Sequence, residues 1–152
     1  MKVSEILKAK GSRVATVPPN AAVKTALKQM QAENIGALVV SRDGQTILGI
    51  VSERDVVRCL VTDGAAVLDK TVTDIMSHPV HTCAPDDHVK RIMAEMTVRR
   101  VRHMPVIAEG RLAGIVSIGD VVKSRLDEVE LEAGVLRDAY VGAYGAESLA
   151  RS

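Results

Sequence analysis

The chain begins with a pattern of hydrophobic and polar residues that predicts short helices and strands in alternation. A short amphipathic helix is expected at Val3–Leu7. The β-branched run Val14–Val17 follows as a strand and stops at two prolines, which lack the backbone N–H that a sheet requires. From Val23 onward, hydrophobic residues recur at helical spacing opposite a polar face, which predicts a helix capped by Asn20.

The pattern then changes to two strands and a closing helix. Ala37–Val40 and Ile47–Ser52 are rich in β-branched and aliphatic residues, as expected of buried strands. Between them lies an Arg-Asp-Gly turn in which Gly44 can adopt a positive φ. Glu53–Leu60 follows directly, with the spacing of a helix.

A second stretch repeats the same order of elements. The letters VSEIL at Val3–Leu7 align with VTDIM at Val72–Met76, both copies contain V-x-T-x-x-P-x-x-x-V-K, and both later carry GIVS. After its opening helix, the second copy is expected to contain a strand at Val80–Ala84, a helix capped by Asp86, strands at Met104–Ala108 and Leu112–Ser117, and a final helix. The chain is therefore an internal duplication.

The duplication divides the chain into two units. The predicted segments are a first repeat at 1–62, a linker at 63–71, a second repeat at 72–126, and a C-terminal helix and tail at 127–152. Each unit alone would leave one hydrophobic sheet face exposed. We therefore expect an α+β fold in which two pseudo-twofold-related repeats pack sheet to sheet.

The C-terminal segment carries more hydrophobic surface than one unit needs. Its apolar positions are Leu126, Val129, Leu131, Val135 and Leu136, in a stretch with a helical pattern. Two interpretations stay open: the helix folds back on its own domain, or it contacts a partner subunit.

Composition narrows the function classes. Of the 152 residues 47% are hydrophobic, yet the chain contains no Phe or Trp and two Tyr, so the core is aliphatic and aromatic stacking on bases is excluded. A net charge of +1 argues against a non-specific nucleic-acid binder. The polar N-terminus suggests neither a signal peptide nor a membrane span, so we expect a cytoplasmic protein with two reduced cysteines.

Two nearly identical phrases carry the candidate chemistry: GIVSERD at Gly49–Asp55 and GIVSIGD at Gly114–Asp120. Each places a serine where a strand gives way to a helix, and helix starts present unpaired N–H groups that suit anions. The aspartate three residues later could accept two hydrogen bonds from the vicinal diol of a ribose. The alternative is a structural N-terminal cap, in which the serine caps the helix and the aspartate complements the helix dipole.

Together these motifs resemble a known family. VTDIMS at Val72–Ser77, RRVRHMPVI at Arg99–Ile107 and the two Gly-Ser-Asp phrases make residues 1–126 similar to a tandem pair of cystathionine-β-synthase (CBS) domains, or Bateman module. The resemblance implies a β-α-β-β-α unit used twice and two clefts for adenosine-containing ligands such as AMP, ADP, ATP, NAD or S-adenosylmethionine. It implies no catalysis and no required cofactor.

The resemblance also implies which residues line each cleft. The cleft named after Asp120 would contain Val17, Ile35, Gly36, Ala37, Arg102, His103, Ser117 and Asp120. The cleft named after Asp55 would contain Ser52, Arg54, Asp55, Cys83, Val101, Arg102 and His103. Because the basic residues differ between the copies, we hypothesise unequal clefts, with Arg102 and His103 meeting phosphate beside Asp120 and Arg54 meeting it beside Asp55.

Other signals are weaker. His78, His81 and Cys83 could bind zinc, but no second pair at ligand spacing lies nearby, so no metal site is predicted. Arg99 and Arg100, with Arg102, could touch nucleic acid, although binding of a ligand's phosphate explains them better. We find no nucleophile–base set and no P-loop.

These observations predict a regulatory sensor of adenine nucleotides that forms a homodimer and acts on an effector protein of unknown identity. Neither a membrane nor a nucleic acid is expected as a partner. The competing hypotheses are an interaction or scaffold protein with degenerate clefts, and a nucleic-acid-binding accessory protein.

Overall fold

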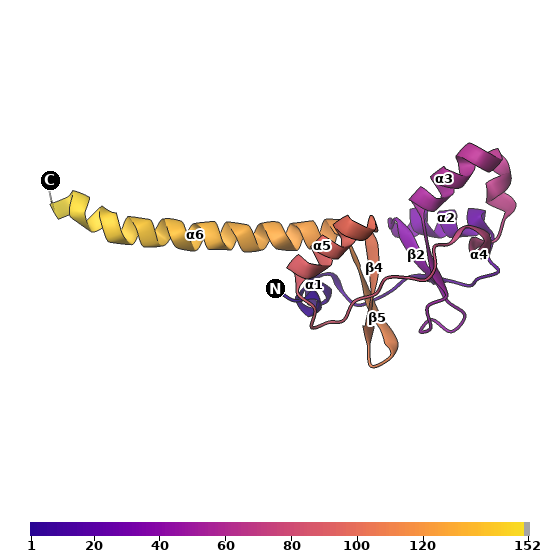
Figure 1. Ribbon diagram of the computed structural model, residues 1–152, viewed down its shortest axis with the longest axis horizontal. Helices are drawn as coiled ribbons and strands as arrows, with labels where there is room; N and C mark the ends of the chain where they lie inside the picture. The colour runs from indigo at the N-terminus through magenta and orange to yellow at the C-terminus, as the bar shows by residue number, and fades with distance from the viewer. Residues whose placement is uncertain (151–152) are drawn as a thin grey trace.

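The computed structural model describes the backbone of residues 1–150 and the side chains of residues 1–142, so the last two residues of the predicted tail lie outside it. Its elements are, in order, α1 (Val3–Lys10), β1 (Thr16–Val17), α2 (Val23–Glu33), β2 (Ala37–Val40), β3 (Gly49–Ser52), α3 (Glu53–Asp63), the 3-10 helix η1 (Gly64–Asp69), α4 (Val72–Ile75), α5 (Val89–Arg99), β4 (His103–Ala108), β5 (Arg111–Ser117) and α6 (Ile118–Ala150). They form two adjacent α+β units, and α6 extends away from both (Figure 1). This confirms the predicted fold class.

The first unit is built on a three-stranded mixed sheet in the order β1-β2-β3. Strand β1 runs parallel to β2, with Thr16 opposite Val39, and β2 runs antiparallel to β3, with Ala37 opposite Ser52. Both outer strands are shorter than the sequence pattern predicted. The predicted turn is confirmed, because Gly44 has a φ of 76°.

The second unit contains the antiparallel pair β4-β5, in which His103 lies opposite Ser117. The strand predicted at Val80–Ala84 is wrong: within the described chain this segment makes a single parallel bridge, between Cys83 and Val106. Pro85 follows the segment immediately and has no N–H to donate, so the ladder ends there.

The predicted caps of the two long repeat helices are also wrong. Helix α2 begins after Ala22 rather than Asn20, and α5 after His88 rather than Asp86. In the described residues neither N-cap side chain makes a capping hydrogen bond. Backbone carbonyls satisfy the first helical N–H groups instead: Val23 donates to Lys70 at 2.8 Å, and Val89 donates to Met1 at 2.9 Å.

These two bonds belong to an exchange of opening helices between the repeats. Helix α1, from the first repeat, packs in the core of the second unit, and α4, from the second repeat, packs in the core of the first. The glycine of each GIVS motif lies where the exchanged opening helix contacts the sheet. A Cβ built on Gly114 would lie 2.6 Å from Leu7 of α1, and one on Gly49 would collide with Met76, which follows α4.

The predicted linker is a packed part of the first unit. It contains η1, whose Val67 is fully buried in the first core. Lys70 forms an ion pair with Asp63 at 3.0 Å across the same segment. The linker therefore contributes hydrophobic contacts as well as connecting the repeats.

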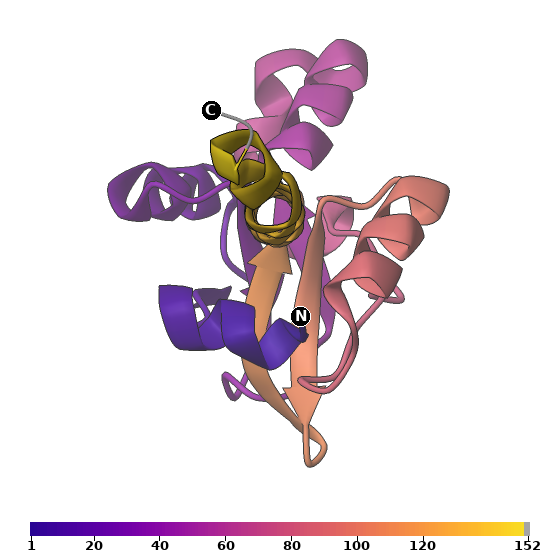
Figure 2. The same cartoon turned by 90° about the vertical axis from the view of Figure 1, so that its left-hand side faces the viewer.

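The closing helix of the second repeat and the predicted C-terminal helix are one continuous helix, α6, of 33 residues. Its first turns belong to the core, since Val121 is 0% exposed and the N-terminal amino group of Met1 pairs with Glu128 at 2.5 Å. Beyond these turns α6 projects outward, and the end-on view along it shows the rest of the protein gathered at its base (Figures 1 and 2). Within the described chain, no helix has the length and apolar character needed to cross a membrane.

Candidate ligand-binding clefts

The repeated Ser-x-x-Asp phrases form reciprocal capping boxes at the starts of two helices. At α3, the Ser52 backbone N–H donates to the Asp55 carboxylate at 2.8 Å, and the Asp55 N–H donates to the Ser52 hydroxyl at 3.4 Å. At α6, the Ser117 N–H donates to Asp120 at 2.9 Å, and the Asp120 N–H donates to the Ser117 hydroxyl at 3.1 Å. The capping interpretation is therefore confirmed in both copies, and the caps hold both aspartates in fixed positions.

The two aspartates have different neighbours. Asp55 is 8% exposed and accepts a hydrogen bond from the hydroxyl of Ser77 at 3.3 Å. The Arg58 guanidinium is 4.0 Å from the Asp55 carboxylate, at the limit of an ion pair, whereas the Lys10 ammonium pairs closely with Asp120 at 2.6 Å. Burial alone would raise the pKa of Asp120, but the bonds from Lys10 and from the Ser117 N–H together lower it. Asp120 is therefore an anion that already has a cationic partner.

The cavity beside Asp55 has a volume of about 600 Å³ and draws its walls from both repeats. Its lining is strongly basic, with five arginines against two carboxylates; the charged residues are Arg54, Arg58, Arg99, Arg100, Arg102, Glu53 and Asp55. His78, His81 and His103 also line it. The arginines are exposed, so their charges face the solvent that fills the cavity. This arrangement favours an anionic ligand.

The cavity on the other side has a volume of about 520 Å³ and is nearly balanced in charge. Its lining includes Lys10, Arg13 and Glu33. Lys10 is paired with Asp120, and Arg13 is paired with Glu33 at 2.5 Å. Because both cations already have carboxylate partners, this cavity attracts anions less than the one beside Asp55.

Most of the predicted site residues are brought together. The residues that line the cavity beside Asp55 as predicted are Ser52, Arg54, Asp55, Val101, Arg102 and His103. Those that line the other cavity as predicted are Ile35, Gly36, Ala37, His103 and Ser117, with Asp120 bonded to its lining residues Lys10 and Ser117.

Three predicted residues lie elsewhere. Val17 is buried in the first core, and Ala15 lines the cavity in its place. Arg102 lines the Asp55 cavity, and only its carbonyl reaches the start of α6, accepting the Ile118 N–H at 2.7 Å. The assignment of Arg102 to the Asp120 cleft is therefore not supported by the geometry.

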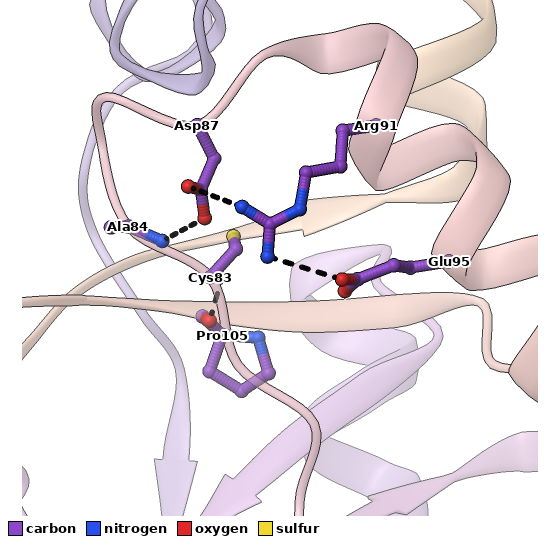
Figure 3. Close-up of polar contacts among 6 residues, drawn as sticks. All are labelled: Cys83, Ala84, Asp87, Arg91, Glu95 and Pro105. Carbon is purple, nitrogen blue, oxygen red and sulfur yellow. Dashed lines mark hydrogen bonds and ion pairs between the residues drawn. The ribbon is translucent and has the colours of Figure 1, made fainter.

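Cys83 is the third of these residues and lies in the core of the second unit. Its thiol is 3.8 Å from the carbonyl of Pro105, beneath a chain of ion pairs that links Asp87, Arg91 and Glu95 (Figure 3). Burial, with the nearby carboxylates of Asp87 and Glu95, raises the pKa of Cys83 to about 12. The thiol is thus protonated at neutral pH, and it is buried in the core while His78 and His81 line the cavity.

In the described part of the chain, no group of three or more His, Cys, Asp or Glu side chains is placed to hold a metal ion. His78 and His81 face the Asp55 cavity while Cys83 is buried, so these three residues do not form a ligand set.

His103 and Gly36 line both cavities and so stand between them. A Cβ on Gly36 would lie 3.8 Å from the His103 imidazole, in ordinary contact. Burial lowers the pKa of His103, and the positive charge of Lys10 lowers it further, against the opposing effect of Asp120. The imidazole is therefore neutral at pH 7 and forms an uncharged wall shared by the two clefts.

Sequence reasoning missed several lining residues. Lys10 reaches the second cavity because α1 crosses to the other unit, and Arg13 reaches it from the connection between α1 and β1. Arg58 and Ser77 reach the first cavity in addition to the predicted set. Arg58 could have been found, since it lies one helical turn after Arg54 on α3. No local pattern in the sequence identifies Lys10 or Arg13 as lining residues, and the position of Lys10 depends on the exchange of opening helices.

Comparison with known proteins gives a consistent result across the chain. The family model of the CBS domain matches residues 3–62 and 72–127. The mitochondrial CBS domain-containing protein CBSX3 of Arabidopsis thaliana is 35% identical over 150 residues, which cover 93% of this chain and 73% of that protein.

Solved structures give the same result. A CBS-domain containing protein from Agrobacterium tumefaciens is similar with a TM-score of 0.79 and 43% identity, over 82% of this chain and 99% of that chain. A CBS domain protein from Pyrobaculum aerophilum, solved in complex with AMP, is similar with a TM-score of 0.73 and 26% identity, over 88% of this chain and 99% of that chain.

Proposed function

Because the chain belongs to the CBS domain family and carries two CBS domains in tandem, we propose that it is a non-catalytic regulatory protein that binds adenosine-containing ligands in two unequal clefts. The observation that carries this proposal is that each cavity has walls from both repeats and an Asp-bearing capping box at its edge. A ligand that touches both repeats stabilises one relative orientation of them. An effector protein that prefers this orientation then responds to the ligand.

In the Asp55 cleft, the ligand is a nucleoside polyphosphate such as ATP or ADP. Asp55 would accept hydrogen bonds from the ribose hydroxyls, as the resemblance implies, and the surrounding arginines would meet the phosphates. Arginine forms paired hydrogen bonds to phosphate oxygens and keeps its charge at any physiological pH. S-Adenosylmethionine carries a positive sulfonium instead of phosphates, so this basic cleft disfavours it.

In the Asp120 cleft, the ligand carries less negative charge. The Lys10 ammonium is paired with the Asp120 carboxylate and has to move away before a ribose diol can bind that carboxylate. Breaking this ion pair costs free energy and so weakens ligand binding, although the displaced lysine can then form an ion pair with a single phosphate group. We therefore propose that a nucleoside or a nucleoside monophosphate binds here, and that it binds more weakly than ATP binds beside Asp55. The Pyrobaculum relative solved with AMP supports a monophosphate as one of the ligands of this fold.

The proposal is tested by isothermal titration of the full chain with ATP, ADP, AMP, NAD and S-adenosylmethionine. We expect ATP to bind more tightly than AMP, and S-adenosylmethionine to bind most weakly. Asp55→Ala should weaken ATP binding by roughly tenfold to a hundredfold, because hydrogen bonds to a charged group contribute about 1.5–3 kcal/mol.

The matched control is Asp74→Ala. Asp74 holds the same place in a capping box, accepting the Thr71 N–H at 3.1 Å at the start of α4, but it lies outside both cavity linings. This variant should lose stability without losing ATP affinity. If none of the five compounds binds at millimolar concentration, the proposal is wrong, and a scaffold protein with degenerate clefts becomes the better hypothesis.

A further inference from the structure

The outer part of α6 is a long exposed helix whose sequence is poorly suited to stand alone. Gly134 and Gly142 lie inside it, and glycine is among the weakest helix formers; Val129, Val135 and Val141 are β-branched. Helices in proteins owe most of their stability to packing of an apolar face against a partner. Yet this part of α6 extends beyond the rest of the molecule (Figure 1).

The exposed hydrophobic residues of α6 follow a heptad repeat. Positions spaced alternately by four and three residues form one stripe, and its members are Val122, Leu126, Val129, Ala133, Leu136 and Tyr140. This is the a and d pattern of a coiled coil, continued over nearly three heptads. Leu126 and Leu136 are among the largest exposed hydrophobic side chains in the described chain.

The charged residues that flank this stripe are complementary to those of a second copy. With Leu126 at an a position, Arg125 and Glu132 occupy g positions, and Glu130 and Arg137 occupy e positions. In a parallel two-stranded coil, a g residue meets the e residue five positions further along the partner helix. Arg125 then faces Glu130 of the second copy, and Glu132 faces its Arg137, so both pairs join opposite charges.

Three of these four charged residues are available for such pairs, and Arg125 already has a partner on its own helix. Glu130, Glu132 and Arg137 are exposed, and within the described part of the chain they make no ion pair. Arg125 pairs with Glu128 on its own helix at 2.8 Å, close to the body of the protein.

The stripe also lies apart from the face of α6 that packs on the body. Val121, Ser124 and Glu128 face the core and the N-terminus, and the centre of the heptad stripe lies about 130° further around the helix. A second helix can therefore cover the stripe without displacing the body. In a parallel pair the twofold axis then places the two bodies on opposite sides of the coil.

We propose that α6 forms a parallel two-stranded coiled coil with α6 of a second copy of this chain. The occupant of the apolar stripe is thus the identical stripe, and the coil corresponds to the partner-subunit contact, one of the two interpretations that the sequence left open. The contact is independent of any ligand in the clefts.

Disulfide trapping tests the proposal directly in the full chain. In a parallel coil the d residue Val129 faces its own copy, so Val129→Cys should cross-link under mild oxidation. The control is Leu131→Cys, at an outward f position on the same helix. We expect dimer from the first variant to form at least about tenfold faster, because a disulfide requires Cα atoms within roughly 4.4–6.8 Å.

The wild-type chain, run beside both variants, gives the contribution of Cys59 and Cys83. Equal cross-linking at both positions would overturn the proposal, because it would indicate random collision. Absence of cross-linking at Val129 would also overturn it, since an antiparallel pair or an unpaired helix does not bring this residue opposite itself.

Hydrogen exchange gives a second test that does not depend on any other dimer contact. Leu136 and Leu131 are both 71% exposed, but only Leu136 lies in the stripe. Leu136→Asp should remove the exchange protection of amides 129–142, whereas Leu131→Asp should leave it unchanged. If both substitutions, or neither, change the protection, the coil is not the structure of α6 in solution.

Discussion

The two halves of the molecule share one frame, the capping box and strand glycine that position the aspartate, but they differ in the charges around it. Each half places a Ser-x-x-Asp capping box at the end of a strand, and each holds its strand glycine against the opening helix of the other repeat. Beside Asp55 the frame is surrounded by arginines, whereas beside Asp120 it is closed by Lys10. Both repeats thus contain the same device that positions the carboxylate, while the side chains around it differ in charge.

The shared frame can be tested first, at the strand glycines. Gly114→Ala should lower the free energy of unfolding by about 1–3 kcal/mol, because its new methyl group overpacks against Leu7. Gly49→Ala should destabilise the first half in the same way, through Met76 and the nearby Ser77 carbonyl at 3.1 Å. Urea unfolding measures both.

Gly134→Ala is the control for these two variants. It lies in α6 with no atom near its added methyl group, so we expect a small gain in stability. If Gly114→Ala were as stable as Gly134→Ala, the close approach of α1 to the second sheet would be wrong.

The difference between the clefts can be tested with two arginines. Arg54→Ala and Arg102→Ala should each weaken ATP binding by roughly fivefold to thirtyfold, or about 1–2 kcal/mol, since an exposed charge contributes less than a buried one. Because both residues line the Asp55 cavity, calorimetry should show both losses in the same site. Arg42→Ala, outside both linings, is the control. Losses in two separate sites would restore the assignment of Arg102 to the Asp120 cleft.

The cleft beside Asp120 can be made more like its counterpart by removing its lysine. Lys10→Met should let a ribose diol reach Asp120 without breaking an ion pair. We expect adenosine, which has no phosphate, to bind this cleft about 1.4-fold to fivefold more tightly, matching the value of about 0.2–1 kcal/mol for partly exposed ion pairs. Lys8→Met on the same helix serves as the control. Unchanged adenosine affinity would mean that Lys10 does not obstruct the carboxylate.

The smallest expected effect concerns the shared wall, His103, and pH. Its pKa is lowered in the folded protein, so the unfolded chain takes up the proton first as the pH falls. Its contribution to stability is therefore complete above about pH 6.5 and is lost as the pH drops from 6.5 through the lower folded pKa. Urea midpoints between pH 7.5 and 5.0 should decline less in His103→Gln than in wild type. The exposed His88→Gln should keep the wild-type slope, and an equal slope in all three proteins would contradict the burial of His103.

Much of the fold followed from the sequence because its signals are local. Helical spacing predicted α2 and α5, β-branched runs predicted β2 to β5, and the internal repeat predicted two units. The capping boxes were also predictable, since a serine and an aspartate three residues apart can bind each other's backbone at any helix start. Errors arose where the backbone is satisfied by distant partners, as for Val23 and Val89, whose N–H groups bind carbonyls far along the chain.

By itself, the sequence determined the duplication, the order of elements and the two carboxylates, because each depends on residues close together in the chain. Only the tertiary structure decided which side chains surround those carboxylates. Helix α1 crosses to the second unit and brings Lys10 to Asp120, and packing buries Cys83 in the core while Arg102 turns toward the Asp55 cavity. The physical reason is that hydrophobic burial is not directional: a helix packs on whichever apolar surface completes a core, and local sequence does not specify that surface.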